Sequence, residues 1–435
     1  MMQIEKIKEK QKEKRKDKVR EKKLKKTKIS KWIGIITLTI LIYQNSFVLA
    51  NLEDKENINV EEIKEEVVET SQNLENEPNL NTRIALIYDR SSGRILYEKN
   101  GNKQTPMAST TKIMTAIIVI ENSNLSDIVT IDAKAAGTGG SRLGLKKNDK
   151  ITVEDLLYGL MLRSGNDAAV ALAIHVGGSV EGFAEMMNQK AIELGLTNTH
   201  FVVPHGLDMQ GHYTTAYELA KMADYALNIT KIKEIVGAKT YTVTINGQPK
   251  VISNTNELLG NLYGVYGVKT GFTNGAGRCL VTACKRENLD IITVVIGADT
   301  KKIRTSDSMK LIEYTFKNYQ MTNIKTKIKE EFEKWKDINQ NRIIINKGVQ
   351  DKIQLELEEL NYEQIAVKNT ELDNIDIEIN MLYYLEAPVE ERKIIGNLKI
   401  MIGDKIIEVL EIYNTMEIRK REIKDYMIEF LKLAQ

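Results

Sequence analysis

The stretch "MASTTKIMTA", Met107 to Ala116, has a serine three residues before a lysine, at the start of an apolar run. The run predicts a helix, and positions i and i+3 of a helix share one face. The Ser109 hydroxyl and the Lys112 ammonium would therefore stand side by side, as a nucleophile beside a possible base. A serine that opens a helix is more often a cap and such a lysine is usually solvated, so this motif alone decides nothing.

Two further short motifs follow in the chain. "LMLRSGND" puts Ser164 and Asn166 in a break between two apolar helical runs, and "VYGVKTGFT" ends a predicted strand with Lys269, Thr270 and Gly271. Each is weak by itself, because S-G-N is ordinary turn sequence and K-T-G can be the solvated end of an edge strand. Together, in this order on helix, loop and strand, the three motifs are the set of penicillin-binding proteins and class A β-lactamases.

Elementary acid–base chemistry explains these residue types. A serine hydroxyl becomes a good nucleophile only when a neighbour takes its proton, and a lysine can do so only if its pKa falls from about 10.4 towards neutrality. Burial and a second nearby cation both lower a lysine pKa. We therefore expect Lys112 to be the base and Lys269 to be that second cation.

Charge is distributed unevenly along the 435 residues. Residues 1–31 hold 15 Lys and Arg against 5 Asp and Glu, and the rest of the chain holds 47 basic against 55 acidic side chains. The part of the chain after residue 31 is therefore net acidic. It does not suit nucleic-acid binding, which needs a basic face to neutralise phosphates. The basic run precedes "WIGIITLTILIY" and a V-x-A site ending at Ala50. Residues 1–50 are therefore predicted to be a signal peptide or an uncleaved signal anchor, with the remainder exported.

Residues 51–80 carry 10 Asp and Glu against 2 Lys and are nearly free of aromatic side chains, which predicts a disordered acidic tether. In residues 81–320, alternating apolar runs flank a helical middle segment, and the first two runs surround the turn Ser91 to Gly93. This order predicts an α+β domain with one antiparallel sheet built from both ends of the segment and closed by a helix. Cys279 and Cys284 are five apart on a predicted strand, so they face opposite sides and should be unbridged core residues.

Short alternating runs such as "NRIIINK" and "KIQLELEEL" predict a small all-β module over residues 321–415. Residues 416–435, "MEIRKREIKDYMIEFLKLAQ", have an apolar stripe and several cations, which fits either a membrane-surface helix or a helix packed on the module. The stripe consists of Ile423, Tyr426, Met427, Phe430, Leu431 and Ala434.

With these motifs, the region from Thr82 to Tyr319 resembles the serine-type D-Ala-D-Ala carboxypeptidases, the low-molecular-mass penicillin-binding proteins that trim peptidoglycan stem peptides. "PHGLD" at Pro204 to Asp208, "HYTTAYELA" at His212 to Ala220, and "NTNELL" before "VKTGFT" are also similar to that family. Thr322 to Tyr413 resembles its accessory C-terminal domain. The β-lactamase/transpeptidase-like fold, a peptidoglycan stem-peptide substrate and acylation by β-lactams are what this resemblance implies.

The resemblance also implies roles for the residues around the nucleophile. Ser164 would relay a proton to the leaving amine, and Asn166 would hold an amide of the substrate. The backbone N–H groups of Ser109 and Phe272 would form the oxyanion hole.

A second group of residues would bind the terminal carboxylate of the substrate. Lys269 and Thr270 would contact it directly, and Gly271 would let the substrate backbone approach the strand. Arg304 lies where the family has a carboxylate-binding arginine. Related carboxypeptidases also end in an amphipathic anchor, so the resemblance favours a membrane surface for the C-terminal helix, on the outer face of the cytoplasmic membrane.

Several other functions are weighed against this one. A class A β-lactamase would need a glutamate in an E-x-x-L-N segment, and "ELGLTN", Glu193 to Asn198, is one residue out of register. A D,D-endopeptidase that cuts cross-links would use the same residues. The four histidines lack the H-E-x-x-H spacing of a metallopeptidase, so we expect no metal or other cofactor, and His175 reads as a packed core residue. An inactive wall-binding module is disfavoured because the motif residues are intact.

Overall fold

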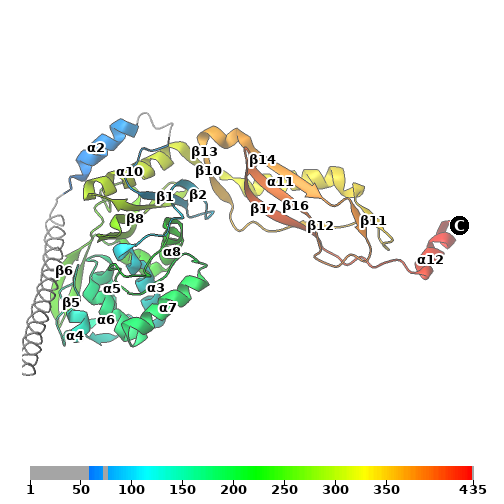
Figure 1. Cartoon of the computed structure of the whole chain (residues 1–435). Coiled ribbons are helices and arrows are strands. Elements are labelled where there is room, and N and C mark those ends of the chain that lie inside the picture. The colour runs from blue at the N-terminus through cyan, green and yellow to red at the C-terminus, as the bar shows by residue number, and fades with distance from the viewer. Residues whose placement is uncertain (1–57, 72–76, 434–435) are drawn as a thin grey trace, which may run out of the picture. The chain divides into compact units, whose positions relative to one another are not determined.

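A computed structural model describes residues 58–71 and 77–433 of the chain (Figure 1). The predicted signal peptide or anchor, residues 1–50, lies outside the described residues. Within them, we call residues 84–318 the first domain and residues 319–414 the C-terminal module.

The first domain is built on a five-stranded sheet with the strand order β2-β1-β9-β8-β7. All neighbouring strands in it are antiparallel, and the strands come from both ends of the domain, as the sequence predicts. The predicted turn at Ser91 to Gly93 joins the first two strands: both side-chain oxygens of Asp89 accept hydrogen bonds from serines of the turn. The strands are β1 (Ile84–Asp89), β2 (Ile95–Lys99), β7 (Val265–Thr273), β8 (Gly277–Arg286) and β9 (Leu289–Ala298).

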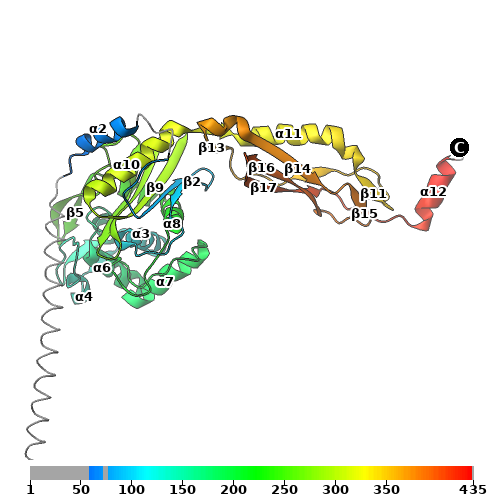
Figure 2. The same cartoon turned by 45° about the horizontal axis from the view of Figure 1, so that its top comes forward.

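Helices cover the two faces of this sheet (Figures 1 and 2). The closing helix α10 (Lys301–Asn318) packs on β8 and β9 from one side, and helices of the middle segment lie on the other. The middle segment contains η1 (Ala108–Thr111), α3 (Lys112–Asn122), α4 (Ala133–Ala136), α5 (Val153–Met161), α6 (Asn166–Gly177), α7 (Val180–Glu193), α8 (Ala216–Asn228) and α9 (Thr230–Gly237). It also holds two hairpins, β3 (Ile128–Thr130) with β4 (Lys150–Thr152) and β5 (Thr240–Ile245) with β6 (Gln248–Ser253).

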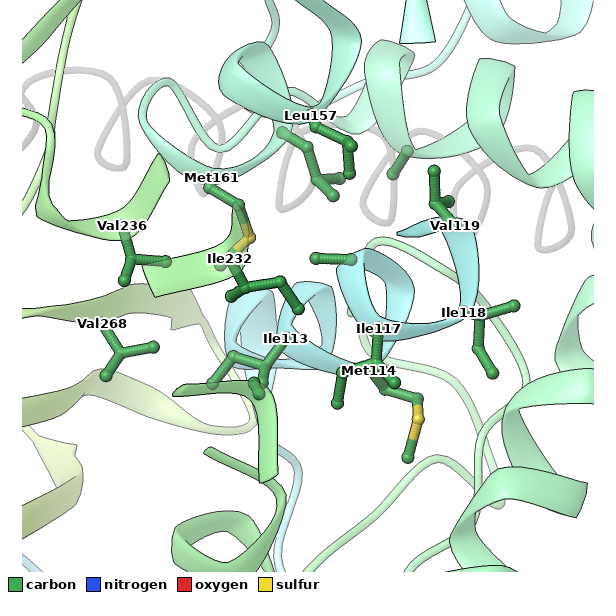
Figure 3. Packing of buried hydrophobic residues seen from close by; sticks show 14 of the residues in the cluster. Ile113, Met114, Ile117, Ile118, Val119, Leu157, Met161, Ile232, Val236 and Val268 are labelled. Atoms are coloured by element: carbon green, nitrogen blue, oxygen red, sulfur yellow. The ribbon is translucent and has the colours of Figure 1, made fainter. Parts of the chain in front are cut away.

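Helix α3 lies at the centre of the core. Every residue from Lys112 to Val119 is buried, and a helix that is apolar on all sides must be enclosed on all sides. Figure 3 shows its isoleucines and methionine packed among side chains of α5, α9 and β7. The first turn of this enclosed helix carries the S-x-x-K motif, so the core itself holds the motif in place.

Part of the predicted tether is ordered. Residues 60–71 form helix α2 (Val60–Ser71), which packs on α10 and buries Val60, Ile63 and Val67. The prediction of disorder is therefore wrong for this stretch. These three apolar residues recur at spacings of three and four, which gives one apolar face that a neighbouring helix can cover despite the acidic composition.

The C-terminal module contains the predicted strands, and four of them form an antiparallel sheet with the order β12-β17-β16-β14. The strands of the whole module are β10 (Tyr319–Asn323), β11 (Ile344–Asn346), β12 (Leu355–Leu357), β13 (Gln364–Lys368), β14 (Ile375–Met381), β15 (Tyr384–Glu386), β16 (Ile394–Ile402) and β17 (Lys405–Asn414). Short 3-10 turns, η2 (Gln340–Arg342) and η3 (Asn369–Asn374), complete it.

The module also has a helix that the sequence analysis did not predict, α11 (Ile324–Asn339). The Asn323 side chain caps its first turn by accepting from the Thr326 N–H, and Ile324, Ile328 and Phe332 are buried in the module core. This spacing of four is a helical signal. The many lysines and glutamates between these positions hid it among short strand-like runs.

The last described element is helix α12 (Ile423–Leu433). Five of the predicted stripe residues are exposed large apolar side chains, namely Ile423, Tyr426, Met427, Phe430 and Leu431. Over the described ranges, no helix is both long and apolar enough to span a bilayer.

Candidate active site

The structure joins Ser109 and Lys112 by a hydrogen bond. Ser109 lies in the 3-10 turn η1 and Lys112 begins α3, and the distance from Lys112 Nζ to Ser109 Oγ is 2.9 Å. Lys112 Nζ also lies 2.7 Å from Asn166 Oδ1 and 2.7 Å from the His205 carbonyl oxygen. The last two atoms can only accept hydrogen bonds. A neutral lysine amine has two N–H groups and one lone pair, so these acceptors take both N–H groups and turn the lone pair towards the Ser109 hydroxyl.

Physical conditions around Lys112 favour that neutral amine. The side chain is fully buried, and burial holds its pKa well below the usual range, with the charge of Lys269 lowering it further and Asp167 opposing both. Burial disfavours a charged form and a nearby like charge disfavours it again. Both effects favour the neutral form, which a general base for Ser109 requires.

The backbone around the nucleophile is strained. Ala108, the residue before Ser109, has φ at +48°, and Ser164, in the break between α5 and α6, has φ at +59°. Non-glycine residues rarely adopt such angles, at a cost of about 1–3 kcal/mol each, and they gather at functional sites. Ser164 is buried but makes no hydrogen bond to Ser109 or Lys112 within the described residues.

Asn166 has its amide orientation fixed from both sides. Its Oδ1 accepts from Lys112, while its Nδ2 donates to the Gly139 carbonyl oxygen at 2.7 Å. The next residue, Asp167, is one that the sequence analysis missed. It is fully buried and accepts hydrogen bonds from the N–H groups of Leu143, Gly144 and Leu145, which fastens the loop containing Gly139. The only sequence feature that could have pointed to Asp167 is its position directly after S-G-N.

The K-T-G strand β7 runs beside the nucleophile turn. A Cβ atom on Gly271 would come within 3.0 Å of the Ser109 backbone nitrogen, so a side chain there would crowd the proposed oxyanion hole. Lys269 is 1% exposed, and burial together with the charge of Arg304 lowers its pKa to about 7. Thr270 shares a hydrogen bond of 2.6 Å with the hydroxyl of Thr255.

Phe272 lies on β7, and Arg304 comes from the closing helix α10. The Phe272 ring packs against the guanidinium of Arg278, 3.9 Å from the ring centre. Arg304 is in the first turn of α10 and forms an ion pair with Glu257. The pairing of this arginine with a glutamate was not expected from the sequence.

A known protein family covers most of the first domain. Residues 70–300 match the peptidase family described as D-alanyl-D-alanine carboxypeptidase. The chain belongs to this family.

Among curated relatives, the D-alanyl-D-alanine carboxypeptidase DacF of Bacillus subtilis is 36% identical, over 73% of this chain and 80% of its own length. DacC of Escherichia coli, with the same description, is 33% identical, over 76% of this chain and 82% of its own.

Two solved structures extend the comparison. Penicillin-binding protein 5 of Haemophilus influenzae aligns with a TM-score of 0.66 and 26% identity, covering 79% of this chain and 99% of its own. The Streptomyces K15 DD-transpeptidase aligns with a TM-score of 0.53 and 36% identity, covering 56% of this chain and 99% of its own. The serine-peptidase class and the α+β fold predicted from the sequence are confirmed.

The "PHGLD" loop, quoted above only for its likeness to this family, takes a direct part in the site. Its His205 carbonyl oxygen accepts from Lys112, and a Cβ on Gly206, which has φ at +85°, would overlap the Ala108 carbonyl oxygen. Asp208 accepts from the Thr273 hydroxyl at 2.6 Å and from the Gly275 N–H at 2.9 Å. The loop therefore braces both the nucleophile turn and the end of β7.

His212 is linked to the turn that carries Ser109 through the Thr111 hydroxyl. The Val202 N–H donates to its Nδ1 at 3.0 Å, so the neutral ring carries its proton on Nε2 and donates it to the Thr111 hydroxyl at 2.8 Å. Thr111 in turn donates to the Ala108 carbonyl oxygen. Burial lowers the pKa of His212 to about 4, which keeps this chain of hydrogen bonds neutral at physiological pH.

The structure bears on two further predictions, the β-lactamase glutamate and the position of His175. Glu193 of the "ELGLTN" segment pairs with Lys190 on the surface of α7 and not with any group of the site. His175 is exposed at the end of α6, 3.7 Å from Asp127, so its assignment to the core is wrong: it falls on the last turn, beyond the buried part of the helix. Over residues 58–71 and 77–433, no three histidine, cysteine or acidic residues group closely enough to hold a metal ion.

Proposed function

We propose that this chain is a D-alanyl-D-alanine carboxypeptidase that removes the terminal D-alanine from peptidoglycan stem pentapeptides through an acyl-serine intermediate. The observation that carries the proposal is the set of three contacts of Lys112, which leaves the lone pair of a neutral amine for the Ser109 proton. Family membership supplies the substrate class.

In the first step, Ser109 Oγ attacks the carbonyl carbon of the last peptide bond while its proton passes to Lys112 Nζ. The N–H groups of Ser109 and Phe272 stabilise the oxyanion. The C–N bond then breaks, and the departing amine of D-alanine receives a proton from Lys112, relayed by Ser164. Water hydrolyses the acyl-serine with the same lysine as base, which releases the shortened peptide and restores Ser109.

Specificity for a free C-terminus comes from cations beside β7. Lys269 and Arg304 supply positive charge and Thr270 a hydroxyl for the terminal carboxylate, while Asn166 holds an amide of the substrate through its side chain. Release of D-alanine from a pentapeptide with a free carboxylate should therefore far exceed release from the C-terminally amidated peptide. Equal turnover of both peptides would favour the D,D-endopeptidase alternative instead.

A fluorescent penicillin tests the nucleophile directly. β-Lactams acylate the same serine, so the purified protein should become covalently labelled and Ser109→Ala should not. Mass spectrometry of the labelled peptide should find the adduct on Ser109. An adduct on another serine would overturn the assignment.

We also propose that the chain acts outside the cytoplasm and rests on the outer face of the cytoplasmic membrane. The exposed apolar stripe of α12, with Phe430 73% and Ile423 81% exposed, supports this because such a helix can bury one face in the headgroup region. Lys424 and its basic neighbours before the helix would strengthen binding to anionic lipid.

Flotation with anionic liposomes tests the helix. A chain from residue 51 to 435 should float, and one ending at Asn414 should stay in the soluble fraction. If both behave alike, α12 is structural and any membrane attachment comes from residues 1–50.

A further inference from the structure

An acidic side chain already forms an ion pair with Arg304, the arginine that is proposed to bind the substrate. Glu257 forms an ion pair with Arg304 Nη2. The arginine side chain is 4% exposed and the glutamate 27%, so the pair lies at the rim of the site with its carboxylate on the open side.

The loop that carries Glu257 is fastened to the K-T-G strand. The Thr255 hydroxyl bonds to that of Thr270, and Asn256 Nδ2 donates to the Gly267 carbonyl oxygen at 3.0 Å. The following residue, Leu258, is fully buried and donates its N–H to Asn256 Oδ1. The backbone on both sides of Glu257 is therefore fixed, and only its side chain is free to turn away.

We propose that the Glu257 carboxylate is a built-in substitute for the substrate's terminal carboxylate, which must displace it from Arg304 before D-alanine can be cleaved. Glu257 is then a specificity-determining residue that sets the apparent affinity for free-carboxylate peptides. This inference rests on the proposed function.

Charge explains why a substitute is useful. The charge of Arg304 lowers the pKa of Lys269, so these two cations interact, and a site without Glu257 would lack its carboxylate as a counter-charge. Glu257 neutralises the arginine while the site is empty. Once a substrate carboxylate arrives, two carboxylates would repel each other at one guanidinium, which drives Glu257 out towards solvent.

Geometry explains why the substrate can win the exchange. Glu257 meets one nitrogen of the guanidinium, Nη2. Bidentate arginine–carboxylate pairs are stronger than single contacts. The substrate carboxylate also gains Lys269 and Thr270, which Glu257 does not touch.

The test is steady-state kinetics of Glu257→Gln with a pentapeptide that has a free C-terminus. Glutamine keeps the size of the side chain and can still accept one hydrogen bond from Arg304, but it removes the competing charge. We expect KM to fall roughly 3- to 10-fold with little change in kcat. The reason is that Arg304 is then no longer paired with a competing carboxylate in the free enzyme. The second-order rate of acylation by a penicillin, which also carries a carboxylate, should rise by a similar factor.

Glu313→Gln is the matched control. Glu313 is also 27% exposed and also pairs with an arginine, Arg286, at the far end of β8. Its substitution should leave KM and kcat unchanged. Glu257→Ala, checked for folding by thermal melting, should lower KM like the glutamine variant.

Unchanged KM in both Glu257 variants would overturn the inference, and so would a raised KM, which would mean that Glu257 orients Arg304 for the substrate. Failure of the proposed function gives a different result, since the unaltered enzyme would then release no D-alanine from the pentapeptide.

Discussion

The first domain buries lysines, aspartates and two arginines, whereas the C-terminal module buries almost only apolar side chains. Lys112, Asp167, Lys269 and Arg304 are each at most 3% exposed. Among the described residues beyond 320, Asn414 is the buried polar residue, and the module core is made of aliphatic side chains with Phe332. Burying a charge costs free energy unless the charge is paired. The buried charges therefore lower the stability of the first domain, and the module has no such cost among its described residues.

The buried charges indicate where in the chain the chemistry takes place. Groups with strongly shifted pKa values gather at functional sites, and Lys112 and Lys269, whose pKa values are both lowered, lie together near Ser109. The module has no comparable cluster among its described residues, so its packing serves stability. Substitutions in the first domain should therefore change chemistry, and those in the module should change stability alone.

The largest expected effect is on acylation. Lys112→Ala removes the base and should lower the second-order rate of penicillin acylation about 10²- to 10⁴-fold, the usual cost of losing a general base. Stopped-flow fluorescence measures this rate, and circular dichroism checks that the variant is folded. An acylation rate within a few-fold of the unaltered protein would assign the base to another group.

A substitution in the module core should do the opposite. Leu398 is fully buried on β16, and Leu398→Ala should lower the free energy of unfolding by about 2–5 kcal/mol through lost burial and a cavity. Its kcat/KM, measured well below the melting temperature, should stay unchanged. A clear loss of kcat/KM in the folded variant would mean that the module takes part in the chemistry.

The pH dependence of kcat/KM separates the two lysines. Lys112 must lose its proton to act as a base, so activity rises with pH as its lowered pKa is passed. Lys269 must keep its proton to bind a carboxylate, so activity should fall by up to tenfold per pH unit above its pKa of about 7. Lys269→Arg should abolish this alkaline fall, because arginine stays charged. A fall that persists in the variant belongs to a different group.

Backbone strain gives the smallest expected effect and the closest comparison. Ala108 beside the nucleophile and Lys347 in the module both have positive φ, +48° and +56°. Glycine at either position should stabilise the protein by about 1 kcal/mol, since it removes the steric cost. We expect Ala108→Gly also to slow acylation by loosening the Ser109 turn, whereas Lys347→Gly should not. Equal acylation rates would show that the strain at Ala108 has no role in catalysis.

Several features of the fold could be predicted from the sequence because the signals are local. The hairpin at Ser91 to Gly93, the closing helix and the unbridged Cys279 and Cys284 follow from turn residues, periodicity and spacing. Helix α2 and helix α11 were missed for one reason. Each has its three buried apolar residues four apart or less in a charged sequence, and such a stripe forms a stable helix only when a neighbour covers it.

The three motifs S-x-x-K, S-x-N and K-T-G predict which residues carry the chemistry, because their side-chain types occur in a known order along the chain. Only the tertiary structure decided what state they are in. The depressed pKa values of Lys112 and Lys269, the tautomer of His212, and the pairing of Glu257 with Arg304 all join residues far apart in the chain. The physical reason is that desolvation and Coulomb interactions act through space, and their size depends on distances and burial that no local pattern encodes.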